Sequence, residues 1–133
     1  TIERGKGFHL VADEKLNVVS KQTANFNRSE GMSVMENMLQ ANSAIQGVFA
    51  HNDEMALGAV EAVGNKKILV VGFDATDDAV AAVKVGKMAA TVAQKPNLMG
   101  ETAVETAIQI LQGETVEKTI PVEVELITKD TAQ

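Results

Sequence analysis

The sequence predicts an α/β domain with a mostly parallel sheet and helices on both faces. Short apolar runs at 45–50, 68–72 and 88–93 each end in a polar residue and are followed at once by a helix start. The run Ile68–Val71 is continuously apolar, as expected for a strand covered on both faces. Helical and strand patterns alternate along the whole chain, which favours parallel strands joined by right-handed crossovers.

The first third of the chain predicts a helix, a strand and a second helix. Residues from about 2 to 13 have helical spacing of apolar side chains, and Leu16–Ser20 has the composition of a strand. We expect Ser29 to cap a helix that runs to about Gln40. Its apolar stripe, which we interpret as core rather than as an adaptable binding face, consists of Met32, Met35, Met38 and Leu39.

The middle of the chain repeats the strand–helix unit. After the run 45–50, Asn52 or Asp53 is expected to cap a helix that extends to about Val63 and ends at Gly64-Asn65. After the run 68–72, Thr76 is expected to cap a helix that extends to about Val85 and stops at Gly86. Residues 88–93 form the next predicted strand.

The last third predicts a long helix and an exposed strand. Pro96 is suited to the first helical turn, and Gly113 ends a helix that runs to about Gln112. The alternating segment 122–127 follows Pro121 and fits an edge strand. The predicted inner side of the long helix carries Leu98, Ala103, Ala107, Ile108 and Leu111.

Composition excludes several functions. The chain has 133 residues and a net charge of −6, which argues against a nucleic-acid ligand. It has no cysteine, so disulfides and thiolate zinc sites are excluded. No apolar stretch approaches the ~20 residues of a membrane span. Because Thr1 lies in sequence typical of a helix interior, we expect the chain to be part of a longer protein.

Three polar residues follow the three apolar runs and form a candidate binding set. Asn52, Asp74 and Gln94 would lie side by side, because the carboxyl ends of parallel strands meet at one edge of the sheet. Two amides and a carboxylate suit a neutral polyol better than phosphate or a metal. Each residue also has a structural interpretation: Asn52 as a helix cap, Asp74 as a cap or loop residue, and Gln94 as a solvated loop residue.

Arg4 and Phe26 extend this set. Arg4 offers five hydrogen-bond donors, and Phe26 follows the first predicted strand and is suited to stacking on the C–H face of a sugar ring. By themselves, an arginine at this position would more often be solvated and a phenylalanine would more often lie in the core. The joint occurrence of five such residues is what favours binding.

Catalytic and metal-binding patterns are absent from the sequence. It contains no placeable Ser-His-acid arrangement and no phosphate-cradling glycine loop. His51 lacks the spaced partners of a metal ligand, and Asp77 and Asp78 fit the first turn of a helix, where acidic residues are favoured. We therefore predict no enzymatic activity, no cofactor and no metal.

Several segments closely resemble bacterial periplasmic D-ribose-binding proteins, of the type I periplasmic sugar-binding family. The block from Val48 to Ala59 and the block from Val70 to Asp74 are typical of the wider sugar-binding family. Arg4, Phe26 and Gln94 narrow the resemblance to ribose. Further similar segments are 3–8, 26–28, 89–94 and 121–122. The resemblance spans essentially the whole chain, with Ala75 standing where many ribose binders have glycine.

The resemblance implies a two-lobed protein that clamps sugar between its lobes. Residues 1–94 would form an incomplete C-terminal lobe, 95–123 would belong to the N-terminal lobe, and 124–133 would be the return crossing and tail. It further implies the residues that bind ribose: hydrogen bonds from Arg4, Asn52, Asp74 and Gln94, and stacking by Phe26.

The resemblance also implies partners and a location. Family members deliver sugar to the membrane permease of an ATP-driven importer, and in some bacteria they dock on a chemoreceptor. The expected location is the periplasm, or an extracellular lipoprotein anchor in a Gram-positive source. The alternative is the effector-binding domain of a sugar-responsive LacI-type repressor, with a sugar-acting enzyme as a distant third.

Overall fold

A computed structural model describes residues 2–132. Its elements are α1 (Ile2–Lys15), α2 (Arg28–Ala41), β1 (Gly47–Phe49), α3 (Asp53–Val63), β2 (Leu69–Phe73), α4 (Asp77–Lys84), β3 (Ala90–Ala93), α5 (Pro96–Leu111) and β4 (Glu125–Thr128). The sheet has the order β1-β2-β3-β4. The first three strands are parallel and β4 is antiparallel to β3, so the predicted mostly parallel sheet is confirmed.

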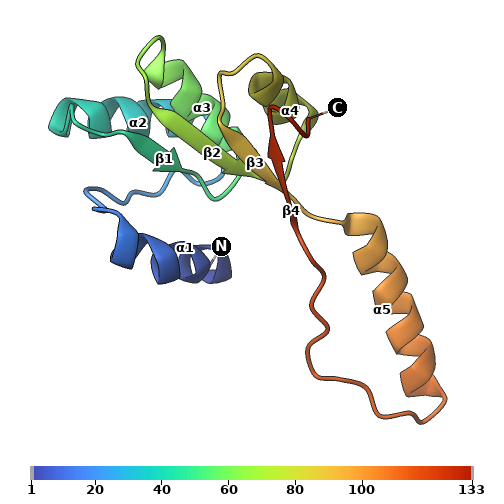
Figure 1. Ribbon diagram of the computed structural model, residues 1–133. Helices are drawn as coiled ribbons and strands as arrows, with labels where there is room; N and C mark the ends of the chain where they lie inside the picture. Colours follow the sequence, from blue (N-terminus) through green and yellow to red (C-terminus); the bar gives the residue numbers. More distant parts are fainter. Residues whose placement is uncertain (1, 133) are drawn as a thin grey trace.

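Helices lie on both faces of the sheet (Figure 1). Because β1, β2 and β3 follow one another in space as in sequence, their right-handed crossovers place α3 and α4 on the same face. Helix α2 packs beside α3. Helix α1 lies against the opposite face, where the Phe8 ring stacks on Phe49 of β1 with ring centroids 5.1 Å apart.

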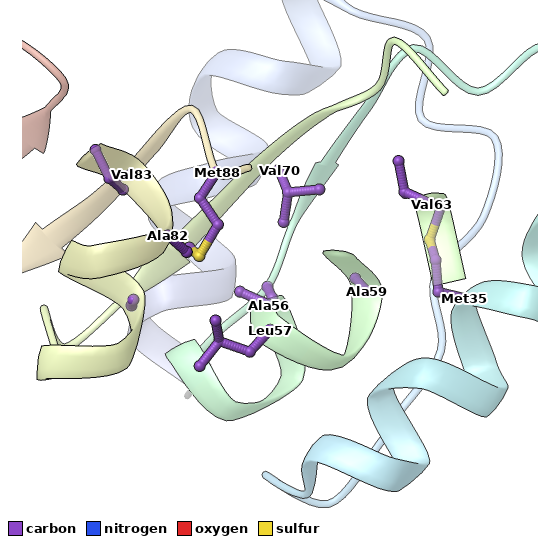
Figure 2. Packing of buried hydrophobic residues seen from close by; sticks show 11 residues of the cluster. Met35, Ala56, Leu57, Ala59, Val63, Val70, Ala82, Val83 and Met88 are labelled. Carbon is purple, nitrogen blue, oxygen red and sulfur yellow. The ribbon is translucent and has the colours of Figure 1, made fainter. Parts of the chain in front are cut away.

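The core fills the space between the sheet and helices α2, α3 and α4 (Figure 2). Met35 is buried in it, as predicted for the methionine stripe of α2. The opposite face of the sheet is less covered, because α1 is the one described helix against it. Leu69 is 66% exposed, so the expectation that the run Ile68–Val71 is covered on both faces was wrong. The buried cluster comprises Met35, Ala50, Ala56, Leu57, Ala59, Val63, Val70, Ala79, Ala82, Val83 and Met88.

Side-chain caps fix the starts of three helices. Thr76 caps α4, as predicted, and Asn52 rather than Asp53 caps α3. The predicted cap of α2 was wrong: Asn27, not Ser29, accepts the hydrogen bond from the Glu30 amide. Asn27 has the extended backbone that a cap requires, whereas Ser29 already lies inside the helix.

The predicted strand Leu16–Ser20 does not form. These residues are irregular, and the sheet begins with β1 at its edge. The segment connects α1 to α2 (Figure 1) and is not paired with β1. A strand is stabilised by pairing with a neighbour, so the β-prone composition of this segment does not suffice.

Helix α5 projects away from the sheet (Figure 1), and the chain returns through an irregular segment to β4. No residue of α5 is buried, so the predicted inner side of this helix has no cover within residues 2–132. β4 is an edge strand, as predicted, although it begins at Glu125 rather than at residue 122. None of the helices in the described range combines the length and apolar character that crossing a membrane requires.

Candidate sugar-binding rim

The carboxyl ends of β2 and β3 bring Asp74 and Gln94 together. The Gln94 side-chain amide donates to Asp74 Oδ1 at 3.1 Å, and Arg4 Nη2 donates to the same oxygen at 2.9 Å. The Arg4 and Asp74 side chains are only 23% and 32% exposed. Three of the five sequence-predicted residues therefore form one hydrogen-bonded cluster. Neither of these two hydrogen bonds involves the other carboxylate oxygen, Asp74 Oδ2.

Arg4 reaches this cluster from the opposite end of the sequence. Helix α1 places it across the sheet, where Nη1 donates to the His51 carbonyl at the end of β1. Its guanidinium also lies 3.8 Å from the centroid of the Phe73 ring, a cation–π contact. These three contacts fix the orientation of the guanidinium plane.

Asn52 and Phe26 are not part of the hydrogen-bonded cluster. Asn52 Oδ1 accepts from the Met55 amide at 3.0 Å, which confirms the helix-cap interpretation of this residue. Phe26 is 50% exposed, in a turn where Asn25 and Phe26 both have positive φ. A ligand role for these two residues stays a prediction.

The loop after β2 has an unusual backbone. Asp74 has φ 116° and Ala75 has φ 54°, both in a region that residues with a Cβ seldom adopt. The Asp74 amide donates to the Val92 carbonyl of β3 at 2.8 Å, so the loop continues the sheet pairing for one residue. The conformation turns the Asp74 side chain toward Arg4 and Gln94.

A buried polar network lies directly beneath this loop, and sequence reasoning missed it. Asp53 is 1% exposed and accepts from the Thr91 hydroxyl at 2.7 Å, from the Thr76 amide at 2.8 Å and from the Thr76 hydroxyl at 3.2 Å. Asp53 directly follows the cap of α3, and the helix macrodipole by itself favours an acidic residue at this position. Only the burial of Asp53 and Thr91 distinguishes this network from an ordinary first turn.

A second charged group that the sequence did not reveal joins three helices. Arg28 of α2 makes two hydrogen bonds to Glu54 of α3, at 2.7 and 3.1 Å, and one to Asp78 of α4 at 2.9 Å. The Glu54 carboxylate, followed by that of Asp78, raises the pKa of Arg28, so the guanidinium stays charged. Asp78 thus pairs with a cation, which supports its predicted structural role.

The pKa of His51 is shifted in the opposite direction to that of Arg28. Burial of the imidazole lowers the pKa of His51, and nearby positive charges, Arg4 among them, add to this effect. In the described part of the chain, no group of three or more His, Asp or Glu side chains is arranged to hold a metal ion. The cluster of Arg4, Asp74 and Gln94 instead offers donors and acceptors in the mixture that sugar hydroxyls require.

Comparison with known proteins agrees with this geometry. Residues 1–115 match the family described as "Periplasmic binding protein domain". The chain is 56% identical to the ribose import binding protein of Bacillus subtilis and 54% identical to that of Haemophilus influenzae. These matches cover 97% and 96% of this chain, but 43% and 44% of the relatives. The chain thus spans less than half the length of these relatives.

Solved structures show the same fold. A solute-binding protein from Actinobacillus succinogenes with bound D-allose superposes with a TM-score of 0.86 at 34% identity, covering 98% of this chain and 49% of that one. The Caulobacter myo-inositol binding protein gives 0.84 at 35% identity, covering 98% and 48%. The resemblance stated from the sequence motifs is confirmed by these matches: the chain belongs to the periplasmic binding protein family.

Proposed function

We propose that this chain is part of the solute-binding component of an ATP-driven importer and binds D-ribose or a closely similar neutral monosaccharide. The names of the Bacillus subtilis and Haemophilus influenzae relatives support ribose, and the polar rim supports a neutral polyol. The proposed ligand-binding residues are Arg4, Phe26, Asn52, Asp74 and Gln94.

The observation that carries this proposal is the convergence of Arg4 and Gln94 on one oxygen of Asp74. A carboxylate held in this way has a fixed orientation, and its second oxygen can accept from a sugar hydroxyl. The Arg4 guanidinium can donate to a neighbouring hydroxyl. A single carboxylate opposed by one arginine leaves little positive charge for a phosphate, so phosphorylated sugars are expected to bind less tightly than ribose.

The proposed division of the chain follows from where its elements pack. Residues 1–94 include the three parallel strands, helices α1 to α4 and the rim, and are proposed to form most of one lobe. The segment 95–123 includes α5, which has no buried residue and is the part assigned to the other lobe. Residues 124–133 include β4, which returns to pair with β3.

Partners and location follow from family membership. The family's name implies a site of action outside the cytoplasmic membrane, and an importer implies a membrane permease as partner. A chemoreceptor is a further proposed partner. The protein is proposed to bind its sugar without chemical change.

The test is Asp74→Ala in the full-length protein, with ribose affinity measured by calorimetry. We expect affinity to fall roughly tenfold or more, because a hydrogen bond to a charged acceptor contributes about 1.5–3 kcal/mol. Asp77→Ala is the matched control: Asp77 is exposed in the first turn of α4 and should leave affinity unchanged. Equal affinities in wild type and Asp74→Ala would remove Asp74 from the site.

A further inference from the structure

We propose that Asp53 and Thr91 are positioning residues that hold the loop 74–76 in the conformation that presents Asp74 to the sugar. The inference rests on the proposed function and adds two residues to it. Neither residue lies on the rim. Both are buried beneath the loop, on the side of the sheet that faces α3 and α4.

Three consecutive backbone amides of the loop are held by hydrogen bonds. The Asp74 amide donates to the Val92 carbonyl at 2.8 Å. The Ala75 amide donates to the Thr91 hydroxyl at 3.2 Å, and the Thr76 amide donates to an Asp53 carboxylate oxygen at 2.8 Å. Two of these three acceptors are side chains, so the loop conformation depends on residues that mutation can change.

Asp53 and Thr91 also hold each other. The Thr91 hydroxyl donates to Asp53 at 2.7 Å while it accepts from the loop, so its one proton and one of its lone pairs are both used. Thr91 is fully buried and Asp53 is 1% exposed, which protects these bonds from competition by water.

The neighbouring strand leaves space for this arrangement. Gly72 pairs with Thr91 across the β2–β3 ladder, and a Cβ built on Gly72 would overlap an oxygen of Asp53. The backbone of Gly72 does not have positive φ. A glycine at residue 72 is therefore required because there is no room for a side chain, and not because of the backbone conformation. The Asp53 carboxylate therefore occupies the space that a side chain at residue 72 would fill.

The loop needs such support because its conformation is unfavourable. Positive φ at two successive residues with a Cβ persists only where the surrounding structure enforces it. Without the acceptor of Thr91, the Ala75 amide would lose its partner and the backbone at Asp74 and Ala75 could relax. The Asp74 carboxylate would then leave the position where Arg4 and Gln94 meet it.

The first test measures ribose affinity in the full-length protein for a graded series at residue 91. Thr91→Ser keeps the hydroxyl and should bind within about twofold of wild type. Thr91→Val removes the hydroxyl and should weaken binding at least fivefold. Thr91→Cys keeps a weak acceptor, should fall between them, and decides the point if the valine variant does not fold. Thr106→Val on α5 is the control for a threonine-to-valine change outside the lobe and should bind as wild type.

The second test distinguishes positioning from general damage to the fold. If Thr91 acts through Asp74, then Thr91→Val and Thr91→Cys should weaken ribose binding in the wild type but change it less than twofold in the Asp74→Ala background. Amide exchange at Ala75 should also be slow in wild type, fast in Thr91→Val and intermediate in Thr91→Cys. Equal losses of affinity in both backgrounds, or full affinity in Thr91→Val, would overturn the positioning role. Full affinity in Asp74→Ala would overturn the proposed site itself, which is a separate result.

Discussion

Asp74 combines a proposed ligand-binding role with an unusual backbone conformation. Its carboxylate is the meeting point of Arg4 and Gln94, and its backbone adopts φ 116°. Strained residues of this kind cluster where a protein holds a group in a fixed direction. The direction of the Asp74 side chain is therefore determined by the loop backbone as much as by its own rotamer.

Ala75 gives a prediction about the strain in this loop. With φ 54°, Ala75 is in the left-handed region, which costs an L-residue about 1–2 kcal/mol. Ala75→Gly in the full-length protein should therefore raise the free energy of unfolding by about 1 kcal/mol, measured by urea denaturation. The control Ala81→Gly, in the middle of α4, should lower it by roughly 0.5–1 kcal/mol. The same loss in both variants would show that the loop is not strained.

His51 gives a prediction about pH. Its pKa is lowered by burial from the usual 6.5, so the folded protein binds this proton less readily than the unfolded chain. The stability due to neutral His51 is complete above 6.5 and is lost as the pH falls from there through the folded-state pKa. Unfolding of the full-length protein by urea should show this loss as the pH falls below about 6.5.

One variant assigns that loss to His51: His51→Gln should flatten the decline. An unchanged slope in His51→Gln would assign the decline to other groups.

At the scale of elements, glycine allows α2 and α3 to pack closely. A Cβ on Gly58 would overlap the Arg28 carbonyl oxygen, and a Cβ on Gly31 would lie 2.8 Å from the Met55 carbonyl oxygen. Backbone atoms of one helix therefore lie directly against the other. The bonds from Arg28 to Glu54 then join the two helices at their N-terminal ends.

This close packing predicts opposite effects of glycine-to-alanine changes in two helices. Gly58→Ala should lower the free energy of unfolding by about 1–3 kcal/mol or more, because the helices must move apart. Gly7→Ala in α1 meets nothing within 4 Å and should raise it by roughly 0.5–1 kcal/mol, through better helix propensity. Denaturant titration of both full-length variants tests the prediction. A neutral Gly58→Ala would mean that α2 and α3 do not pack in this way.

At the scale of the whole molecule, the uncovered apolar side chains of α5 are the most informative feature. Ile108, Ile110 and Leu111 are all exposed on a helix that no other described element covers. An apolar surface of this extent favours association with another surface. The proposed partner is the other lobe of the full-length protein, with the segments 94–95 and 123–124 as crossings between the lobes.

The proposed clamp predicts a change in shape on binding. In the proposed clamp, Arg4, Asp74 and Gln94 bind the sugar from one side, so ribose should favour the state in which the other lobe closes on it. Small-angle scattering of the full-length protein should show a smaller radius of gyration at saturating ribose. The Asp74→Ala variant, at a ribose concentration below its dissociation constant, should keep the larger value. A radius that does not fall on saturation would contradict the clamp, whatever the affinity.

The sequence by itself determined the features that depend on neighbouring residues. Apolar runs located β1, β2 and β3, local hydrogen bonding made Thr76 a cap, and Gly64 and Gly113 ended helices with positive φ. The polar residues after β2 and β3 could be assigned to one edge, because parallel strands fix where their carboxyl ends lie. That rule alone predicted that Asp74 and Gln94 would meet.

Only the tertiary structure decided the features that depend on distant partners. The segment 16–20 has strand composition but no pairing partner, so it stays irregular. Asp53 resembles any acidic residue in a first helical turn until Thr91, far along the chain, is packed against it. The positive φ of Asp74 has no local sequence cause, since it is enforced by hydrogen bonds from other strands and helices. Such constraints arise from packing, which no short stretch of sequence contains.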